Sequence, residues 1–214
     1  KAARRGVEIA PNQETRIALA MALATAGMPD KALPVYEDIL KDNPKHASAA
    51  PNSCFVQTLT NSTPKDLRSQ RQKWYEANRY TGPVAPHTND KSPDRKLRIG
   101  YVSGDFKCHS AAMIFGGVVL RHSAQFEVYL YSSLAVDEKA DARTKQFRDC
   151  AGERWRDISA LDDEKADAMI RADKIDILVD LAAHTNGGRL ALFTRKPAPV
   201  QVTAWGFAHG TGCP

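Results

Sequence analysis

The sequence lacks several features that would place a chain outside the ordinary globular proteins. Its longest apolar run, residues 111–120, is too short to span a bilayer, so we expect no membrane partner. The four cysteines form no Cys-x-x-Cys pair and no cysteine–histidine set at zinc-ligand spacing, which argues against structural zinc. They are expected to be reduced thiols in the cytoplasm. No G-x-G-x-x-G follows a predicted strand, so dinucleotide binding of the dehydrogenase kind is not supported.

What is present is a composition that can build a core. The chain has 214 residues, 43% of them hydrophobic and 26% charged, which suits one ordinary domain with a smaller module. The net charge of +5 favours anionic ligands, but lysine and arginine are dispersed along the sequence. An RNA-binding module would need clustered basic residues with exposed aromatics, so nucleic acid is not an expected partner.

Residues 1–46 carry a helical repeat pattern. Pro11 and Pro44 lie 33 positions apart, close to the period of about 34 residues of tetratricopeptide repeats. The positions that resemble the tetratricopeptide motif are Leu19, Gly27, Ala32, Tyr36 and Pro44. Arg16 stands where an aromatic residue is usual, and an ordinary helical hairpin is the alternative. Because so few repeats cannot bury a continuous face, we expect further repeats before Lys1.

Residues 47–94 are predicted to connect this region to a second domain. The pattern stays helical to residue 80, with a helix beginning at Pro64. Residues 81–94 contain three prolines and a glycine and are predicted to be a linker without regular structure.

Residues 95–214 alternate between strand and helix patterns. Strands are predicted at residues 97–102, 126–131, 155–158, 175–181 and 200–204, and helices at residues 111–122, 139–150, 161–172 and 188–195. This succession predicts a doubly wound, Rossmann-like lobe with a parallel sheet. The expected fold class is therefore α+α/β, with helical hairpins followed by the Rossmann-like lobe.

Three predicted strands are followed by loops that contain glycine with histidine or threonine. The loops are SGDFKCH (103–109), AAHTNGGR (182–189) and WGFAHGTG (205–212). Carboxyl ends of parallel strands share one sheet edge, and glycines let backbone amides approach a ligand. The residues expected to converge there are His109, His184, Thr185, Gly206, His209 and Thr211.

Local pattern alone favours a simpler interpretation of the first loop. Asp105 could cap the following helix, and His109 could be a solvated loop residue. A metal site built from histidine and cysteine is a competing hypothesis, which the absence of short ligand spacing disfavours.

Three long segments carry a family resemblance in the same order and spacing. They are LRIGYVSGDFKCHS, ILVDLAAHTNGGRL and RKPAPVQVTAWG. They resemble the N-terminal catalytic lobe of O-linked N-acetylglucosaminyltransferases of the bacterial, SPINDLY-related kind, in which tetratricopeptide repeats lead into the lobe. The resemblance extends from Gln13 to Pro214 and implies the N-terminal half of a GT-B glycosyltransferase.

The resemblance implies transfer of GlcNAc from UDP-GlcNAc to protein Ser or Thr hydroxyls, with inversion and without a metal or other cofactor. His109 and Asp157 match residues considered as the base that removes the hydroxyl proton. The matching substrate-binding positions are Asp105, His184, Thr185, Gly206, Phe207 and Thr211. The common form WLGYPGTTG is replaced here by AWGFAHGTG (204–212). The donor therefore stays open between GlcNAc, fucose and another hexose.

The resemblance also implies partners and a missing part. Protein acceptors would bind through the tetratricopeptide repeats, and the donor is a UDP-sugar. In the family, uridine and diphosphate are held chiefly by a second lobe, which would follow Pro214. We therefore predict that residues 1–214 alone show no transfer and weak or no UDP binding. The alternative is a tetratricopeptide interaction scaffold whose attached lobe is not catalytic.

Overall fold

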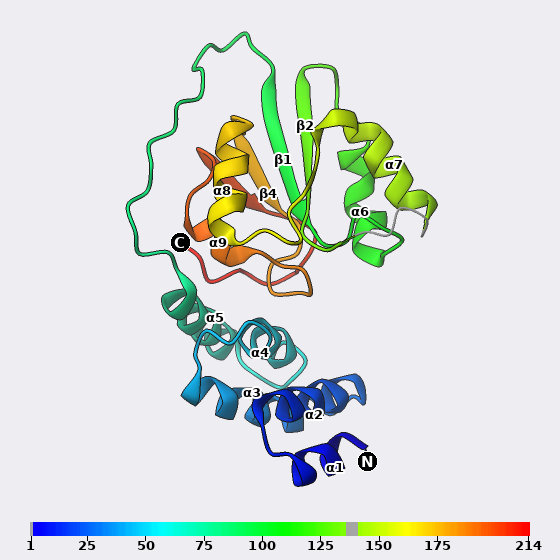
Figure 1. The fold of residues 1–214 in the computed structure, drawn as a ribbon, viewed down its shortest axis with the longest axis vertical. Coiled ribbons are helices and arrows are strands. Elements are labelled where there is room, and N and C mark those ends of the chain that lie inside the picture. Colours follow the sequence, from blue (N-terminus) through cyan, green and yellow to red (C-terminus); the bar gives the residue numbers. More distant parts are fainter. Residues whose placement is uncertain (1, 136–140) are drawn as a thin grey trace. The chain divides into compact units, whose positions relative to one another are not determined.

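The structure is a computed structural model that describes residues 2–135 and 141–214. It divides into two compact units, one formed by residues 1–79 with 212–214 and the other by residues 80–211 (Figure 1). The predicted connector, residues 47–94, is thus shared between them, because its proline-rich part packs on the second unit.

The first unit is helical. Its helices are α1 (Ala2–Ile9), α2 (Gln13–Thr25), α3 (Pro29–Asp42), α4 (Ala49–Gln57) and α5 (Pro64–Asn78). Asn12 and Thr63 each close a capping box at the start of α2 and α5, which satisfies backbone amides that a helix end leaves unpaired. As predicted, α5 begins at Pro64, where the fixed φ of proline suits the first helical position.

Helices α2 and α3 pack through small residues. Ala20 and Ala32 are fully buried, so the two helices can approach closely, and the Tyr36 ring fills the space beside them. Gly27, at φ +72°, makes the turn between the helices, as its position in the sequence predicted. The apolar positions of this pattern therefore form the core of the first unit.

The second unit contains a parallel sheet of five strands. They are β1 (Leu97–Ser103), β2 (Phe126–Ser132), β3 (Trp155–Asp157), β4 (Ile177–Asp180) and β5 (Val200–Thr203). All neighbours are parallel, and the spatial order is β3-β2-β1-β4-β5. The chain moves outward from β1 to β3 and then crosses to β4 on the other side of β1. This is the doubly wound arrangement that the sequence predicted.

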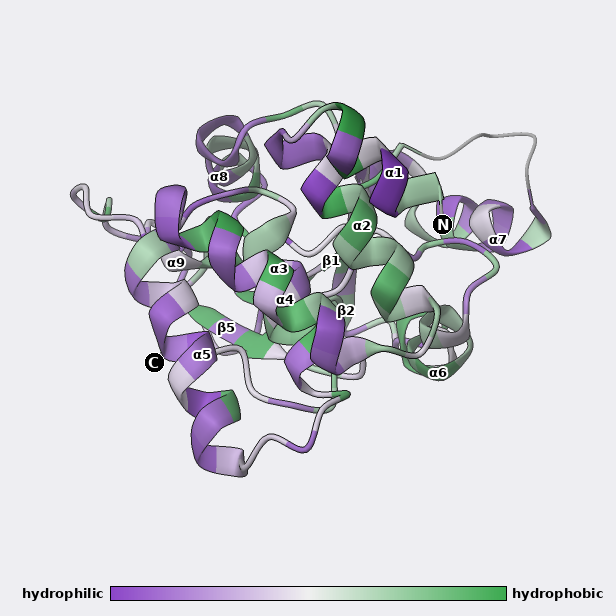
Figure 2. Cartoon of the chain, turned by 90° about the horizontal axis from the view of Figure 1, so that it is seen from below, coloured by the Kyte–Doolittle hydropathy of each residue, from purple (hydrophilic) through white to green (hydrophobic). Residues whose placement is uncertain are grey.

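Helices cover both faces of the sheet (Figure 1). On one face α6 (Ser110–Val119) and α7 (Ala142–Ala151) bury a core that includes Phe106, Phe115 and Phe147. On the other face α8 (Asp163–Ala172) and α9 (Leu190–Thr194) bury Leu178, Ile170 and their neighbours. Figure 2 shows the contrast between the apolar α6 and the hydrophilic α5 and α8. None of the helices in the described part of the chain is long and apolar enough to cross a membrane.

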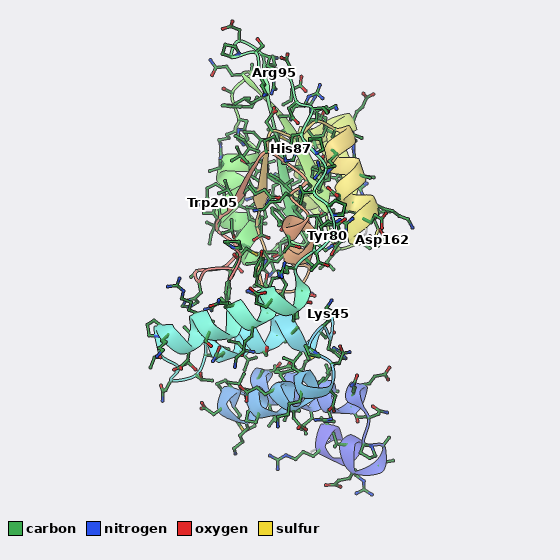
Figure 3. All side chains as sticks on the ribbon, turned by 90° about the vertical axis from the view of Figure 1, so that its left-hand side faces the viewer. Lys45, Tyr80, His87, Arg95, Asp162 and Trp205 are labelled. Atoms are coloured by element: carbon green, nitrogen blue, oxygen red, sulfur yellow. The ribbon has the colours of Figure 1, made fainter. Side chains whose placement is uncertain are left out.

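The predicted linker lies along the second unit, where Tyr80, His87 and Arg95 mark its course (Figure 3). The Tyr80 amide donates to Thr194 Oγ1 at 2.8 Å, and Arg171 donates to the Ala85 carbonyl at 3.1 Å. These bonds hold the irregular segment where its prolines exclude a helix or a strand.

The structure shortens several predicted elements and corrects one cap. The helix predicted at residues 111–122 runs from Ser110 to Val119, and the His109 side chain caps it, so Asp105 is not its cap. The strand predicted at residues 175–181 is ladder-paired only over Ile177–Asp180. The helix predicted at residues 139–150 is α7, and residues 139 and 140 lie outside the described residues.

Candidate functional site

All five strands end at the same edge of the sheet. The ladder joins the strand ends in two rows, Ser103–Ser132–Asp157 and Val102–Asp180–Thr203. The loops that follow β1 and β4 leave from neighbouring strands at the point where the strand order reverses. Open parallel sheets bind ligands in the crevice at this point.

The loop after β1 is anchored in the core. The Phe106 side chain is fully buried and makes edge contacts with Phe115 and Phe147. Asp141, the N-cap of α7, accepts the Cys108 amide at 2.8 Å. That bond and a second amide bond hold the pKa of Asp141 below its usual value. These contacts therefore fix the backbone of the loop that carries Asp105 and His109.

His109 and Asp105 lie together in this loop. His109 Nδ1 is 3.3 Å from the Ala111 amide nitrogen, which it caps, and 3.5 Å from Asp105 Oδ2. The His109 side chain is 44% exposed, whereas Asp105 is buried. Burial raises the pKa of Asp105, while His109 and Lys107 act in the opposite direction. The pair thus combines a solvent-accessible imidazole with a desolvated carboxyl group.

The loop after β4 is organised by Asp180, a residue that the sequence analysis did not single out. Its buried carboxylate accepts the amides of Ala182 and Ala183 at 3.0–3.1 Å and the Thr203 hydroxyl at 2.9 Å. Burial raises the pKa of Asp180, and these bonds act against the rise. Ala183 adopts φ +48°, a left-handed conformation that costs about 1 kcal/mol or more for a residue other than glycine. The carboxylate holds that turn in place.

His184 follows this turn and is 1% exposed. Its Nε2 lies 2.7 Å from the Thr211 carbonyl oxygen, which only accepts, so Nε2 carries the proton. The Phe207 ring meets the His184 ring edge-on at 6.1 Å and the His209 ring at 5.6 Å. Thr185, in contrast, uses its hydroxyl within its own turn, donating to the Ala182 carbonyl at 2.6 Å. The loops after β4 and β5 are therefore joined through His184.

Glycines allow the loops to touch. A Cβ on Gly206 would lie 1.7 Å from the Leu181 carbonyl oxygen, so only glycine fits there. A Cβ on Gly104 would lie 3.2 Å from the Gly187 Cα, and Ser133 Oγ donates to the Gly187 carbonyl at 2.6 Å. Glycine was expected to open the backbone to a ligand. At Gly206 the close approach is instead to the backbone of the neighbouring strand end.

Asp157 lies apart from these residues. It is an exposed residue at the end of β3, the edge strand, and its Oδ1 accepts the Ser159 amide at 2.9 Å. β3 is separated from β1 by β2, which places the strands about 10 Å apart. The structure thus brings His184, Gly206, Phe207 and Thr211 together and pairs His109 with Asp105. It leaves Asp157 two strands away.

Part of this arrangement had a signal in the sequence. Asp180 ends the apolar run IDILVD, and an acidic residue closing a buried strand is an unusual position that invites attention. Ser133 and Asp141 carry no such signal. Among the described residues, no three His, Cys, Asp or Glu side chains gather as a metal site would require, and the need for a metal stays a prediction.

The sequence of this chain is similar to those of known proteins. The family described as glycosyl transferase family 41 matches residues 78–214. A Petunia hybrida protein named probable UDP-N-acetylglucosamine–peptide N-acetylglucosaminyltransferase SPINDLY is 36% identical over 187 residues, covering 82% of this chain and 19% of that protein. The Arabidopsis thaliana protein of the same name is 42% identical over 130 residues, covering 59% of this chain and 14% of that protein.

A solved structure agrees with the sequence matches. A mutant of the Thermobaculum terrenum O-GlcNAc transferase superposes with a TM-score of 0.88 at 32% identity, covering 98% of this chain and 40% of that one. The chain spans about a fifth of the length of the first two curated relatives and two fifths of the solved one. The match over residues 78–214 includes every loop of the candidate site, and the chain belongs to glycosyl transferase family 41.

Proposed function

We propose that this chain forms part of an inverting glycosyltransferase that moves GlcNAc from UDP-GlcNAc to Ser or Thr hydroxyls of proteins. The observation that carries the proposal is the meeting of the loops after β1, β2, β4 and β5 at the switch point of the sheet. The relatives named as peptide N-acetylglucosaminyltransferases support the donor and the acceptor class. The reaction needs no further cofactor in this proposal.

His109 is the base that we propose for the acceptor hydroxyl. A hydroxyl is a poor nucleophile until a positioned group begins to take its proton. The His109 side chain is 44% exposed and so is open to a substrate. The His184 ring is buried and uses Nε2–H to hold the Thr211 carbonyl, which suits shaping the pocket better than proton transfer. Asp157 is the second candidate base.

The loops after β4 and β5 are proposed to shape the sugar pocket. Gly206 brings the β5 loop against the end of β4, and Phe207 packs its ring against His184. Thr211 contributes the carbonyl that His184 Nε2 contacts, and Thr185 follows His184 in the β4 loop. Phe207, Ala208 and His209 differ from the common family form, so we propose that this loop sets the choice among GlcNAc, fucose and another hexose.

The helical unit is proposed to be tetratricopeptide structure that binds the protein acceptor. The burial of Ala20, Ala32 and Tyr36 between α2 and α3 supports this assignment, since these are motif positions. We place the protein in the cytoplasm, where reduced thiols persist. None of the four cysteines forms a disulfide in the structure.

The test is a transfer assay with the longer protein that contains this chain. We expect radiolabelled GlcNAc to pass from UDP-GlcNAc to a Ser/Thr peptide, and His109→Ala to lower kcat by about 10²-fold or more. Asp157→Ala identifies the base if His109→Ala leaves transfer untouched. Asp149→Ala is the control, because Asp149 is exposed on α7 and its ion-pair partner among the described residues is Lys145.

A second measurement separates the enzyme from the scaffold alternative. Titration of residues 1–214 with UDP is expected to show weak or no binding. Micromolar affinity would refute the proposal that a second lobe holds the uridine and diphosphate. A longer protein that binds protein partners through its helices, yet neither binds UDP-sugar nor transfers, would be the non-catalytic scaffold.

A further inference from the structure

Nδ1 of His109 lies near two groups, the Ala111 backbone amide and the Asp105 carboxylate. Nδ1 lies 3.3 Å from the Ala111 amide nitrogen and 3.5 Å from Asp105 Oδ2. To accept from the amide, Nδ1 must be unprotonated, whereas to donate to the carboxylate it must carry the proton. The two contacts therefore belong to different tautomers of the neutral ring.

The tautomer decides whether His109 can act as a base through its other nitrogen. If Nδ1 caps the helix, the proton of the neutral ring is on Nε2, which then has no lone pair to offer a hydroxyl. If the proton is on Nδ1 and faces Asp105, the Nε2 lone pair is free. A carboxylate behind an imidazole favours this second state and also stabilises the imidazolium that forms.

Asp105 is held in place to act on this ring. The residue is 7% exposed, its amide donates to Ser103 Oγ at 3.0 Å, and its carbonyl accepts the Lys107 amide at 2.7 Å. Among the described residues, no Lys or Arg lies within salt-bridge distance of its carboxylate, and His109 Nδ1 lies 3.5 Å from Oδ2. Lys107 acts on it only at longer range.

We propose that Asp105 is a positioning residue that holds neutral His109 in its Nδ1–H tautomer, in which Nδ1 gives up its cap on the Ala111 amide, and so frees Nε2 to take the acceptor proton. The catalytic consequence rests on the proposed function. In that reaction the hydroxyl oxygen bonds to the anomeric carbon and its proton passes to Nε2. The bond from the anomeric carbon to the diphosphate oxygen breaks, and UDP leaves with the electron pair. Asp105 thus lies behind His109, where the family resemblance predicted a substrate contact.

The tautomer can be measured without any activity. Long-range ¹H–¹⁵N correlation spectra of the histidine rings in this 214-residue chain, at a pH where His109 is neutral, should show its proton on Nδ1. In Asp105→Asn the proton should move to Nε2, because the Asn amide can donate to Nδ1. Asp149→Asn should leave the His109 spectrum unchanged. A wild-type ring protonated at Nε2 would overturn the proposal, and this spectrum decides the matter even if Asp105→Asn does not fold.

Kinetics of the longer protein test the consequence. Asp105→Asn should lower kcat by about 10²-fold and leave the KM for UDP-GlcNAc unchanged, because the donor contacts remain. An unchanged kcat together with a shifted tautomer would overturn the positioning role. If the wild-type protein transferred no sugar at all, the proposed function would fail, while the spectra would still decide whether Asp105 sets the tautomer.

Discussion

Buried carboxylates have different partners at the two edges of the sheet. The amino edge is where the parallel strands begin, and the carboxyl edge is where they end. At the amino edge, Asp176 accepts both Nη atoms of Arg95 at 2.6–2.7 Å, the Asn89 amide at 2.7 Å and the Arg98 backbone amide at 2.8 Å. At the carboxyl edge, Asp105 and Asp180 are also buried. Within residues 2–135 and 141–214, neither lies within salt-bridge distance of a lysine or arginine.

The different partners shift the pKa values of these carboxyl groups in opposite directions. Burial alone would raise the pKa of Asp176, but Arg95, the Arg98 amide and Asn89 outweigh it, so the pKa is lowered. The pKa values of Asp105 and Asp180 are raised by burial. At the amino edge, the ion pair between Arg95 and Asp176 and the hydrogen bond from Asn89 to Asp176 join the linker to the sheet. At the carboxyl edge, Asp180 accepts backbone amides of a turn and Asp105 lies beside His109. Carboxyl groups with shifted pKa values often occur at functional sites.

The largest expected effect of breaking this contrast is on stability at the amino edge. Asp176→Ala removes four hydrogen bonds and leaves Arg95 without its bidentate partner, so the free energy of unfolding should fall by about 3 kcal/mol. Urea unfolding followed by circular dichroism measures it. The control Asp149→Ala removes an exposed ion pair with Lys145 and should cost less than about 0.5 kcal/mol. Equal losses in both variants would contradict the account.

A second effect concerns the contact between the β4 and β5 loops. Gly206→Ala places a Cβ against the Leu181 carbonyl, which should cost about 1–3 kcal/mol and displace the loop that carries Phe207. The matched control in the same loop is Gly210→Ala, since a Cβ there meets nothing within 4 Å. The urea midpoints of the two variants give the comparison. A Gly206→Ala protein as stable as Gly210→Ala would show that the loops are not packed as described.

Thr203→Val tests the carboxyl edge itself. The substitution keeps the shape of the side chain but removes the hydroxyl that donates to Asp180 at 2.9 Å. Because the acceptor is a buried carboxylate, the loss should be about 1–3 kcal/mol. It should raise the pKa of Asp180 further, which carboxyl ¹³C shifts would report. No change in either quantity would mean that Thr203 does not support Asp180.

The smallest expected effect is on the pH dependence of the free energy of unfolding, to which Asp176 and Asp180 should contribute with opposite signs. Asp176, with a lowered pKa, stabilises the fold above the unfolded value of about 3.9, and this contribution is lost as the pH falls through the folded value. Asp180, with a raised pKa, favours the fold most at low pH and loses that contribution as the pH rises from about 3.9.

Unfolding free energies between pH 2.5 and 6 can separate the two carboxylates. Asp176→Asn should flatten the loss of stability on the acid side, and Asp180→Asn should flatten the loss as the pH rises. Changes of the same sign in both variants would contradict the contrast between the edges.

The sequence predicted the fold well where local pattern decides it. The apolar run before Ser103 and the helix pattern after it define the first strand, loop and helix, and the small residues at Ala20 and Ala32 predicted close helix packing. The order of the strands in the sheet cannot be predicted from the local sequence pattern. The distance of Asp157 from His109 follows from β3 lying at the edge, which only the assembled sheet reveals.

The finer geometry of the site depends on contacts between distant residues. Asp180 is bonded to Thr203, 23 positions away, and Ala183 is left-handed although nothing in its type predicts that. The tautomer of His109 depends on 3.3 Å and 3.5 Å contacts that a sequence cannot supply. Sequence therefore indicated which loops to compare, and the structure shows which residues support the conformations of these loops.

Hydrogen–deuterium exchange of the longer protein, with and without UDP-GlcNAc, tests the central claim most directly. The account predicts slower exchange in residues 103–109, 181–189 and 204–211, and unchanged exchange in residues 88–98 at the amino edge. Protection confined to residues 88–98, or none in the three loops at saturating donor, would contradict it.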